Sequence, residues 1–323
     1  MSISGIFEKN LGIGREGTWG VVGTVHEWIP FTEEKFDLEI PYTNINQTWA
    51  KRDLQKTYQQ TRVINSSFGF DVEPENGIGN LLKSLLGTSN SVRFGTFNSY
   101  KHTFDCTDAV NLPSLFARIQ QYGTFTKDYT GLRINTLELS WNKDENIKCS
   151  VEMIGQNELS GTSTVGTYGT IQPFTQFGNT QVWIDGTVNT DIQNVSLQIN
   201  NNLSPHQLTG TAKTIGQLTA GMREVTGEML IFFNGETERN KFINKTVSTL
   251  QIKAQQGTFT LSGTAKYELN VLLPNIEYTA FPFDKEDGVL AATVPYKALY
   301  HAGNSVGTNS IAVELINSIA SYL

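Results

Sequence analysis

The sequence predicts a mainly β protein with a few short helices, built as two similar halves in tandem. Apolar and polar residues alternate along many segments of the 323-residue chain, and a period of two is typical of half-buried strands. Charged residues make up only 17% of the chain, while Gly, Asn, Thr and Ser are abundant. That composition favours strands and turns over solvated helices. In addition, one pattern occurs twice, about half the chain length apart.

The repeated pattern consists of a strand, an acidic turn and a short amphipathic segment. Alternating residues 225–233 precede an acidic turn and a segment that starts near Phe242. Residues 64–70 precede a similar acidic turn and the segment 78–86. The offset is 225 − 64 = 161 residues, and residues 38–40 align with 197–199 at an offset of 159. A duplicated module in a polar β-rich chain indicates a ring or tube subunit.

The repeat suggests four parts. Residues 1–20 form an N-terminal arm, 21–156 a first domain, 157–180 a linker and 181–323 a second domain. Domains of this length are ordinary in size. Residues around the midpoint are rich in Gly, Ser, Thr and Gln, which is typical of a linker.

Three helices and one unusually long strand are expected. Apolar residues of segment 78–86 fall on one helical face, and Gly87 can end that helix. Segment 113–121 and the segment from Phe242 are the other two candidate helices. Residues 258–271 alternate without a break and predict one long strand. Two long connections, 41–61 and 200–224, occur at equivalent places, and loops of this length usually serve contacts.

Sites of chemistry are not evident. Residues 12–17 match the glycine spacing of a dinucleotide motif without its strand–helix context, so a flexible arm is the better interpretation. The acidic turns precede helices, where carboxylates act as caps. With two Cys, four scattered His and a net charge of −7, we expect no enzyme activity, catalytic residue, cofactor or metal site, and no sequence-reading nucleic-acid binder. No signal peptide or membrane-spanning run is visible, so we expect no membrane insertion.

Several segments resemble one protein family. They are Gly-Arg-Glu-Gly-Thr-Trp-Gly at 14–20, Gly-Phe-Asp-Val-Glu-Pro-Glu-Asn-Gly-Ile-Gly at 69–79, Leu-Arg-Ile-Asn-Thr-Leu-Glu-Leu-Ser at 132–140, Gly-Met-Arg-Glu-Val-Thr-Gly at 221–227 and Ile-Ala-Val-Glu-Leu-Ile-Asn at 311–317. In these segments the chain resembles the major tail tube proteins of long-tailed, siphovirus-like bacteriophages. The resemblance implies tail-tube-type β-sandwich or barrel domains with a flanking helix, arranged in six-domain rings around a lumen.

Because the chain has room for two such domains, three chains would complete a pseudo-hexameric ring. The rings would stack into the channel through which the genome is delivered. One alternative is a single tube domain with a decoration domain, in a true hexameric ring. Another is a β-rich adhesin or glycan-binding protein unrelated to tails.

The resemblance also implies partners and location. The chain would contact itself within and between rings, and would meet a tape-measure protein, a tail terminator and distal tail or baseplate proteins. Double-stranded DNA would pass without specific binding. The protein would reside in the virion tail after assembly in the host cytoplasm.

Two groups of residues are candidate sites. Apolar anchors in the first long connection are expected at contacts between rings: Trp49, Leu54 and Tyr58. The polar face of the predicted long strand is expected to face the lumen: Thr260, Ser262, Thr264, Lys266 and Glu268. Residues 100–106 are a second candidate for the lumen, and an outer solvated face is the alternative for both segments.

Overall fold

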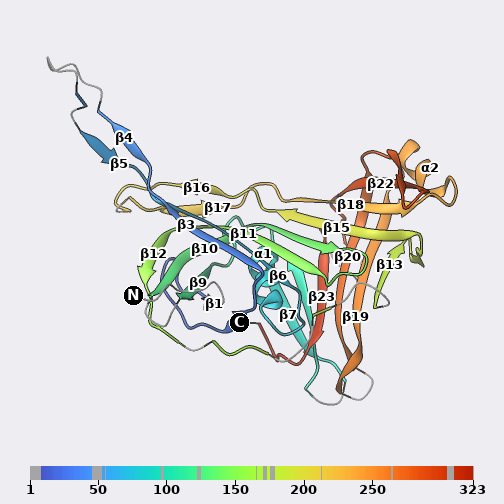
Figure 1. Cartoon of the computed structure of the whole chain (residues 1–323), viewed down its shortest axis with the longest axis horizontal. Coiled ribbons are helices and arrows are strands. Elements are labelled where there is room, and N and C mark those ends of the chain that lie inside the picture. The colour runs from blue at the N-terminus through green and yellow to red at the C-terminus, as the bar shows by residue number, and fades with distance from the viewer. Residues whose placement is uncertain are drawn as a thin grey trace.

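The structure is a computed structural model. It describes residues 9–45, 53–54, 56–95, 98–121, 125–164, 166–169, 173–174, 179–211, 213–262, 265–303 and 309–322, with the backbone alone at 257–260 and 262. The described chain is mainly β with two short helices, as the sequence predicts (Figure 1).

The longest sheet, which we call sheet I, crosses both halves of the chain. All its neighbouring strands are antiparallel. In spatial order they are β3 (Glu33–Glu39), β6 (Val63–Asp71), β11 (Lys148–Gly155), β10 (Phe125–Trp141), β15 (Ile192–Asn200), β18 (Glu224–Phe232) and β22 (Val289–Ala298). The short strand β21 (Phe283–Glu286) pairs with β22.

A second layer, sheet II, also combines the two halves. Its order is β7 (Gly87–Arg93), β8 (Tyr100–Cys106), β23 (Ala312–Asn317), β20 (Ala265–Tyr278), β19 (Ser248–Ser262) and β13 (Thr180–Ile184), with β14 (Thr187–Val188) beside β13. The end of β20 pairs with β22 and joins sheet II to sheet I. Among the described strands the ladders branch, and none of them joins β3 to β21.

A smaller sheet III covers one end of the first half. It contains β2 (Glu27–Ile29), β1 (Lys9–Arg15), β9 (Leu115–Gln121), the first part of β10 and β12 (Asn157–Ser160). Between its two parts β10 changes partners at Gly131, whose φ of +67° favours glycine. The expected N-terminal arm is therefore wrong for residues 9–15, since Leu11 and Ile13 of β1 are buried.

The core lies between the sheets. One cluster of buried side chains includes Leu139 and Leu197 from sheet I together with Phe104 and Leu269 from sheet II. Because β10 lies against β15 and β8 against β23, strands of both halves complete the same two sheets. The predicted domains 21–156 and 181–323 thus share their sheets, and the division into two tube domains stays a prediction.

Strand register repeats along the chain. In β3 and β6, Leu38 lies opposite Ile64. In β15 and β18, Ile199 lies opposite Val225. Both partners shift by the same amount (199 − 38 = 161 and 225 − 64 = 161), so the alignment at 159 was two residues short. We call β3 to β11 the first repeat and β15 to β22 the second repeat.

Each repeat carries a hairpin in its long connection. In the first it consists of β4 (Tyr42–Asn44) and β5 (Thr57–Gln59), and in the second of β16 (Ser204–His206) and β17 (Gln217–Thr219). Their registers also agree at 161, since 42 + 59 = 101 and 204 + 219 = 423, which differ by 2 × 161. The β4–β5 hairpin projects from the body in Figure 1, whereas β16–β17 lies along it.

The helices follow β6 and β18. Helix α1 (Ile78–Leu86) ends at Gly87 with φ +103°, as predicted. A helix also follows β18, but its predicted start near Phe242 is wrong, because α2 (Thr237–Ile243) ends one residue after Phe242. The expected capping by local acids is wrong for α1, because no side chain caps Gly77. Instead Glu27 of β2 bonds the Gly77 backbone and the Asn80 side chain, so the carboxylate at this helix start comes from a distant strand.

Two other expectations are wrong. Segment 113–121 is the strand β9 rather than a helix, because it is paired on both sides, by β1 and β10, and buries both of its faces. The predicted strand 258–271 is two strands, β19 and β20, which pair at Ser262 and Ala265. Residues 263 and 264, within the predicted strand, lie outside the described residues.

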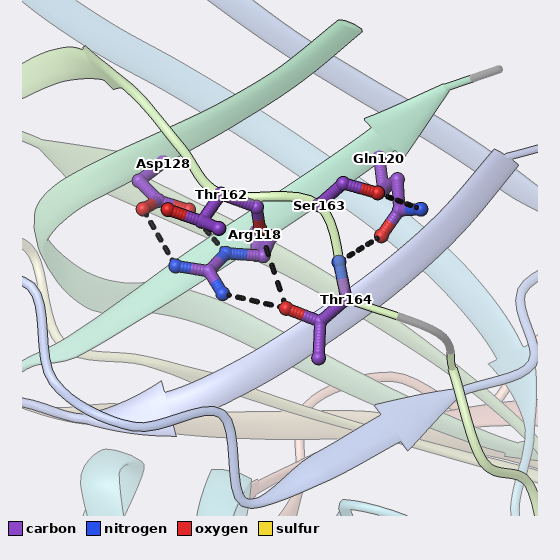
Figure 2. Close-up of polar contacts among 6 residues, drawn as sticks. All are labelled: Arg118, Gln120, Asp128, Thr162, Ser163 and Thr164. Carbon is purple, nitrogen blue, oxygen red and sulfur yellow. Dashed lines mark hydrogen bonds and ion pairs between the residues drawn. The ribbon is translucent and has the colours of Figure 1, made fainter. Parts of the chain in front are cut away.

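The predicted linker packs back on the first repeat at its described residues. It begins as β12, paired to β10. Arg118 of β9 makes a bidentate ion pair with Asp128 at 2.7 and 2.8 Å and donates to the Thr164 hydroxyl at 3.1 Å (Figure 2). Gln120 accepts from the Thr164 N–H at 2.9 Å. Further along, Phe174 is fully buried and bonds the backbone of Val72.

Candidate functional surfaces

The outward face of sheet I is strongly acidic. Along the strands of both repeats, every second side chain points away from the core. Among the described residues of this face, carboxylates outnumber lysines by ten to three. They are Glu33, Asp37, Glu39, Asp71, Glu138, Glu152, Glu224, Glu228, Asp284 and Glu286, against Lys35, Lys148 and Lys297. Much of the chain's net charge of −7 is therefore placed on one face.

The centre of this face is polar and open. Glu138 of β10 lies opposite Ser150 of β11 on one side and Gln198 of β15 on the other. All three side chains are exposed. This row crosses from the first repeat to the second, so the face is continuous across the two.

The outward face of sheet II is balanced in charge. Lys101 of β8 pairs with Glu314 of β23 at 2.6 Å. Glu314 accepts from Asn270 of β20 at 3.1 Å, and Asn270 accepts from Gln251 of β19 at 2.9 Å. One hydrogen-bonded row therefore spans four strands. Among the described side chains of this face, three lysines face three carboxylates: Lys101, Lys253, Lys266, Asp105, Glu268 and Glu314.

The two segments expected to face the lumen lie on this sheet II face. Lys266 and Glu268 are on β20, and β8 (Tyr100–Cys106) lies one strand beyond β23. Glu268 pairs with Lys253 at 3.0 Å rather than with Lys266. Thr260 and Ser262 are on β19, but their side chains lie outside the described part of the chain, as does Thr264 entirely.

The residues expected at contacts between rings lie on the first hairpin. Leu54 and Tyr58 are exposed there, and Trp49 lies outside the described residues. Sequence reasoning missed a groove in the second repeat, beside the start of β18 and the end of β22. This groove encloses about 650 Å³ and is lined in part by Met222, Arg223, Leu299 and Tyr300. The repeat could have indicated this groove, because Arg223 stands 161 residues after Arg62 and is its counterpart.

Chemical sites are not apparent in the described chain. No group of three metal-ligating side chains occurs within the described ranges. No helix among the described residues has the length and apolar character needed to cross a membrane. Glycines at the dinucleotide-like motif serve packing, since a Cβ on Gly14 would stand 2.3 Å from the Phe116 ring and 2.2 Å from the Thr24 carbonyl.

Repeated β modules with two extended polar faces define a structural β-sheet protein. A comparison with family models makes the class specific: the model described as phage tail tube protein matches residues 7–298. The chain belongs to the phage tail tube protein family and is a structural component of a virion tail. A comparison with curated proteins found no similar sequence.

Proposed function

We propose that three copies of this chain form each ring of the tail tube, and that stacked rings form the channel for genome delivery. The repeats supply the six positions of the ring. The single observation that carries the proposal is the recurrence of strand and hairpin register at 161 residues. Two modules with one register can occupy equivalent places around an axis.

The junction between the repeats offers a template for the junction between chains. Leu139 of β10 lies opposite Leu197 of β15, and both are buried. Leu139 also lies opposite Cys149, which itself lies opposite Phe70. The counterpart of Phe70 is Ile231 (70 + 161 = 231), and Ile231 lies opposite Ala292, so Ala292 is the counterpart of Cys149. Phe283 of β21 lies opposite Ala292 and is thus the counterpart of Leu139. Unlike Leu139, Phe283 is exposed.

Applying the same register between chains brings β21 of one copy against β3 of the next. Leu139 lies opposite Leu197, and the counterpart of Leu197 in the first repeat is Phe36 (36 + 161 = 197). Phe283, the counterpart of Leu139, would therefore lie opposite Phe36 of the next chain. Asp284 would lie opposite Lys35, which adds an attraction between opposite charges. Pairing these edge strands would also remove the aggregation hazard of exposed edges. Sheet I would in this way continue from chain to chain and close around the axis.

We propose that the acidic face of sheet I lines the channel. A closed sheet is needed for the wall, and sheet I is the sheet whose edge strands, β3 and β21, could pair from chain to chain in the register of the junction between the repeats. Excess carboxylate repels a polyanion, so DNA would slide without binding. The balanced face of sheet II, which includes Lys266 and Glu268, is the second candidate. Its hydrogen-bonded row supports a solvated outer surface equally well.

The remaining partners follow from a tube of this kind. A tape-measure protein would occupy the lumen before DNA, a terminator would cap the upper end, and distal tail or baseplate proteins would bind the lower end. Six chains with one tube domain and one decoration domain remain the alternative arrangement.

Electron cryo-microscopy of tubes assembled from the purified protein tests the proposal. A reconstruction without imposed symmetry should show three chains per ring, with the two repeats in alternating positions. True six-fold density with one full chain per repeating unit would contradict it. An absence of tubes and rings at any protein concentration would contradict self-assembly into rings.

A further inference from the structure

The two hairpins are equivalent in register but differ in what they touch. Ile215, next to β17, is 1% exposed. Leu54, next to β5, is 64% exposed although it stands at the same position, since 54 + 161 = 215. The difference arises because the second hairpin lies on the first repeat, whereas the described part of the first hairpin projects from the body (Figure 1).

The seat of the second hairpin is formed by the start of β6, the middle of β10 and the end of β11. The Arg62 N–H donates to the Lys213 carbonyl at 2.8 Å, and Arg62 forms a parallel bridge with Thr214. The Gln156 amide donates to the Ile215 carbonyl at 2.9 Å. The Arg133 guanidinium donates to the carbonyl of Leu218, a fully buried residue. Contacts to the hairpin's backbone carbonyls thus fix the hairpin in one register.

The same seat in the second repeat is the groove of about 650 Å³. Arg223 is the counterpart of Arg62, and Leu299 is the counterpart of Gln156 because β22 matches β11 at an offset of 143 (299 − 156 = 143). Both residues line the groove. Beside them, Met222 is 78% exposed and Tyr300 is 69% exposed. A surface that is covered in the first repeat is therefore open in the second.

We propose that the β4–β5 hairpin of a second copy of this chain occupies this groove. Leu54 brings an apolar side chain to a seat where Leu299 replaces the Gln156 amide, so an apolar contact takes the place of a polar one. Thr214 pairs with Arg62, and the counterparts of these two residues are Asp53 (214 − 161 = 53) and Arg223 (62 + 161 = 223). Asp53 would therefore meet Arg223, which carries the opposite charge. The proposal rests on the proposed ring, in which the next chain places its hairpin on this side.

The contact is head-to-tail, because the hairpin of one copy binds the groove of another and leaves its own groove free. Such contacts close into a ring only when the rotation between copies closes. The hairpins would therefore act within a ring, at the joint between chains, rather than between stacked rings as the sequence suggested.

A designed disulfide tests the contact. The bridge between Arg62 and Thr214 predicts an equivalent approach of Arg223 in one chain and Asp53 in the next, within reach of a disulfide. Chains carrying Asp53→Cys with Arg223→Cys, assembled and then oxidised, should form intermolecular disulfides. The variant Arg62→Cys with Thr214→Cys is the matched control and should form its disulfide within one chain. The native Cys106 and Cys149 are buried, and burial raises the pKa of the Cys106 thiol to about 11, so neither should react near neutral pH.

The size of the product separates this inference from the proposed ring. A covalent trimer supports both. A covalent hexamer or an open ladder supports the hairpin contact and rejects the three-chain ring. Three-fold rings that give no intermolecular disulfide reject the hairpin contact alone.

A second measurement leaves Arg223 intact. Leu54→Cys carrying a photoreactive maleimide, in tubes assembled from mixed light and heavy-isotope chains, should cross-link to residues 220–226 or 297–300 of another chain. Cross-links confined to the same chain, or to any other surface, would overturn the proposal.

Discussion

Tyr267 donates a hydrogen bond to Glu75 at 3.0 Å, across 192 residues of sequence. At the other end of the same strand, Tyr278 donates to Glu238 at 2.6 Å. Strand β20 is thus fixed near one end by Glu75, which precedes α1, and at the other by Glu238, in the first turn of α2. Burial, with a carboxylate beside each hydroxyl, raises the pKa of both tyrosines far above the ordinary value, so both remain donors.

We expect Tyr267→Phe and Tyr278→Phe each to lower the free energy of unfolding by about 1–2 kcal/mol, because a hydrogen bond to a carboxylate is lost. Urea unfolding of unassembled subunits measures this. Tyr58→Phe, on the exposed first hairpin, is the control and should leave stability unchanged. Equal stability of all three variants would show that these hydrogen bonds do not hold β20.

Leu54→Ala and Ile215→Ala should have opposite signatures. Ile215→Ala removes a buried side chain and should cost the subunit about 2–4 kcal/mol of stability. Leu54→Ala should change subunit stability by less than about 0.5 kcal/mol but should raise the protein concentration needed for tube formation several-fold. Calorimetry and light scattering measure the two effects. Normal assembly by Leu54→Ala would argue against a buried Leu54 in the tube.

Reversing the charges of Lys35 and Asp284 tests the proposed pairing of β21 with β3. Lys35→Asp or Asp284→Lys alone would place like charges opposite each other and should block or slow ring formation. Combining both substitutions should restore it, as seen by negative-stain microscopy. Failure of the combined variant, with both single variants folded, would mean that the edges meet in another register.

Stability should decrease as pH rises through neutrality because of Glu27. Burial raises the pKa of this carboxyl to about 7 from its ordinary 4.5, despite the hydrogen bonds from Asn80 and Gly77. Between these values the folded chain holds a proton that the unfolded chain releases, so folding weakens with rising pH, by as much as about 3 kcal/mol in all.

Urea unfolding between pH 5 and pH 8 checks this. The variant Glu27→Gln should lose most of the slope. Glu73→Gln should lose less, because Glu73 has its pKa raised to about 7 but is only half-buried. An unchanged slope in Glu27→Gln would mean that the carboxyl is ionised in the folded state.

Lysines on the two outward faces should reveal which face lines the channel. Ser150→Lys with Gln198→Lys places positive charge on sheet I, and should allow assembly yet slow genome ejection in a salt-dependent way. Thr260→Lys with Thr264→Lys changes two positions that the sequence assigned to the lumen, and on the sheet I proposal it should leave ejection unchanged. The reverse result would assign the channel to sheet II.

Local patterns predicted what local forces determine. The face of α1 and its end at Gly87 follow from side chains within one helix, and they were predicted to the residue. The repeat was visible because Ile64 and Val225 begin the same alternation. The exact alignment of the two repeats could be fixed only from the observed strand pairing. A shift of two residues keeps the same face of a strand buried, so the apolar pattern alone does not distinguish an offset of 159 from one of 161.

Non-local pairing explains what the sequence did not predict. Segment 113–121 has helical spacing, but β1 and β10 supply hydrogen bonds on both its edges and it becomes β9. Glu27 stands at the start of α1 although fifty residues separate it from Gly77 (77 − 27 = 50). The equivalence of Arg223 and Arg62 could be inferred from the repeat. That a hairpin binds at such a site is shown only by the contact of the second hairpin with Arg62, which is non-local in sequence.

Strand β23 has a consequence for how the chain folds as it is made. It lies between β8 and β20, and His102 bonds Asn317 across 215 residues. A ribosome synthesises β8 and β20 well before β23, so neither strand has its neighbour until residue 317 has emerged. Long-range closure of this kind is slow. Chains broken off earlier leave two open edges, and a subunit competent for the tail is available only after residues 312–317 have been translated.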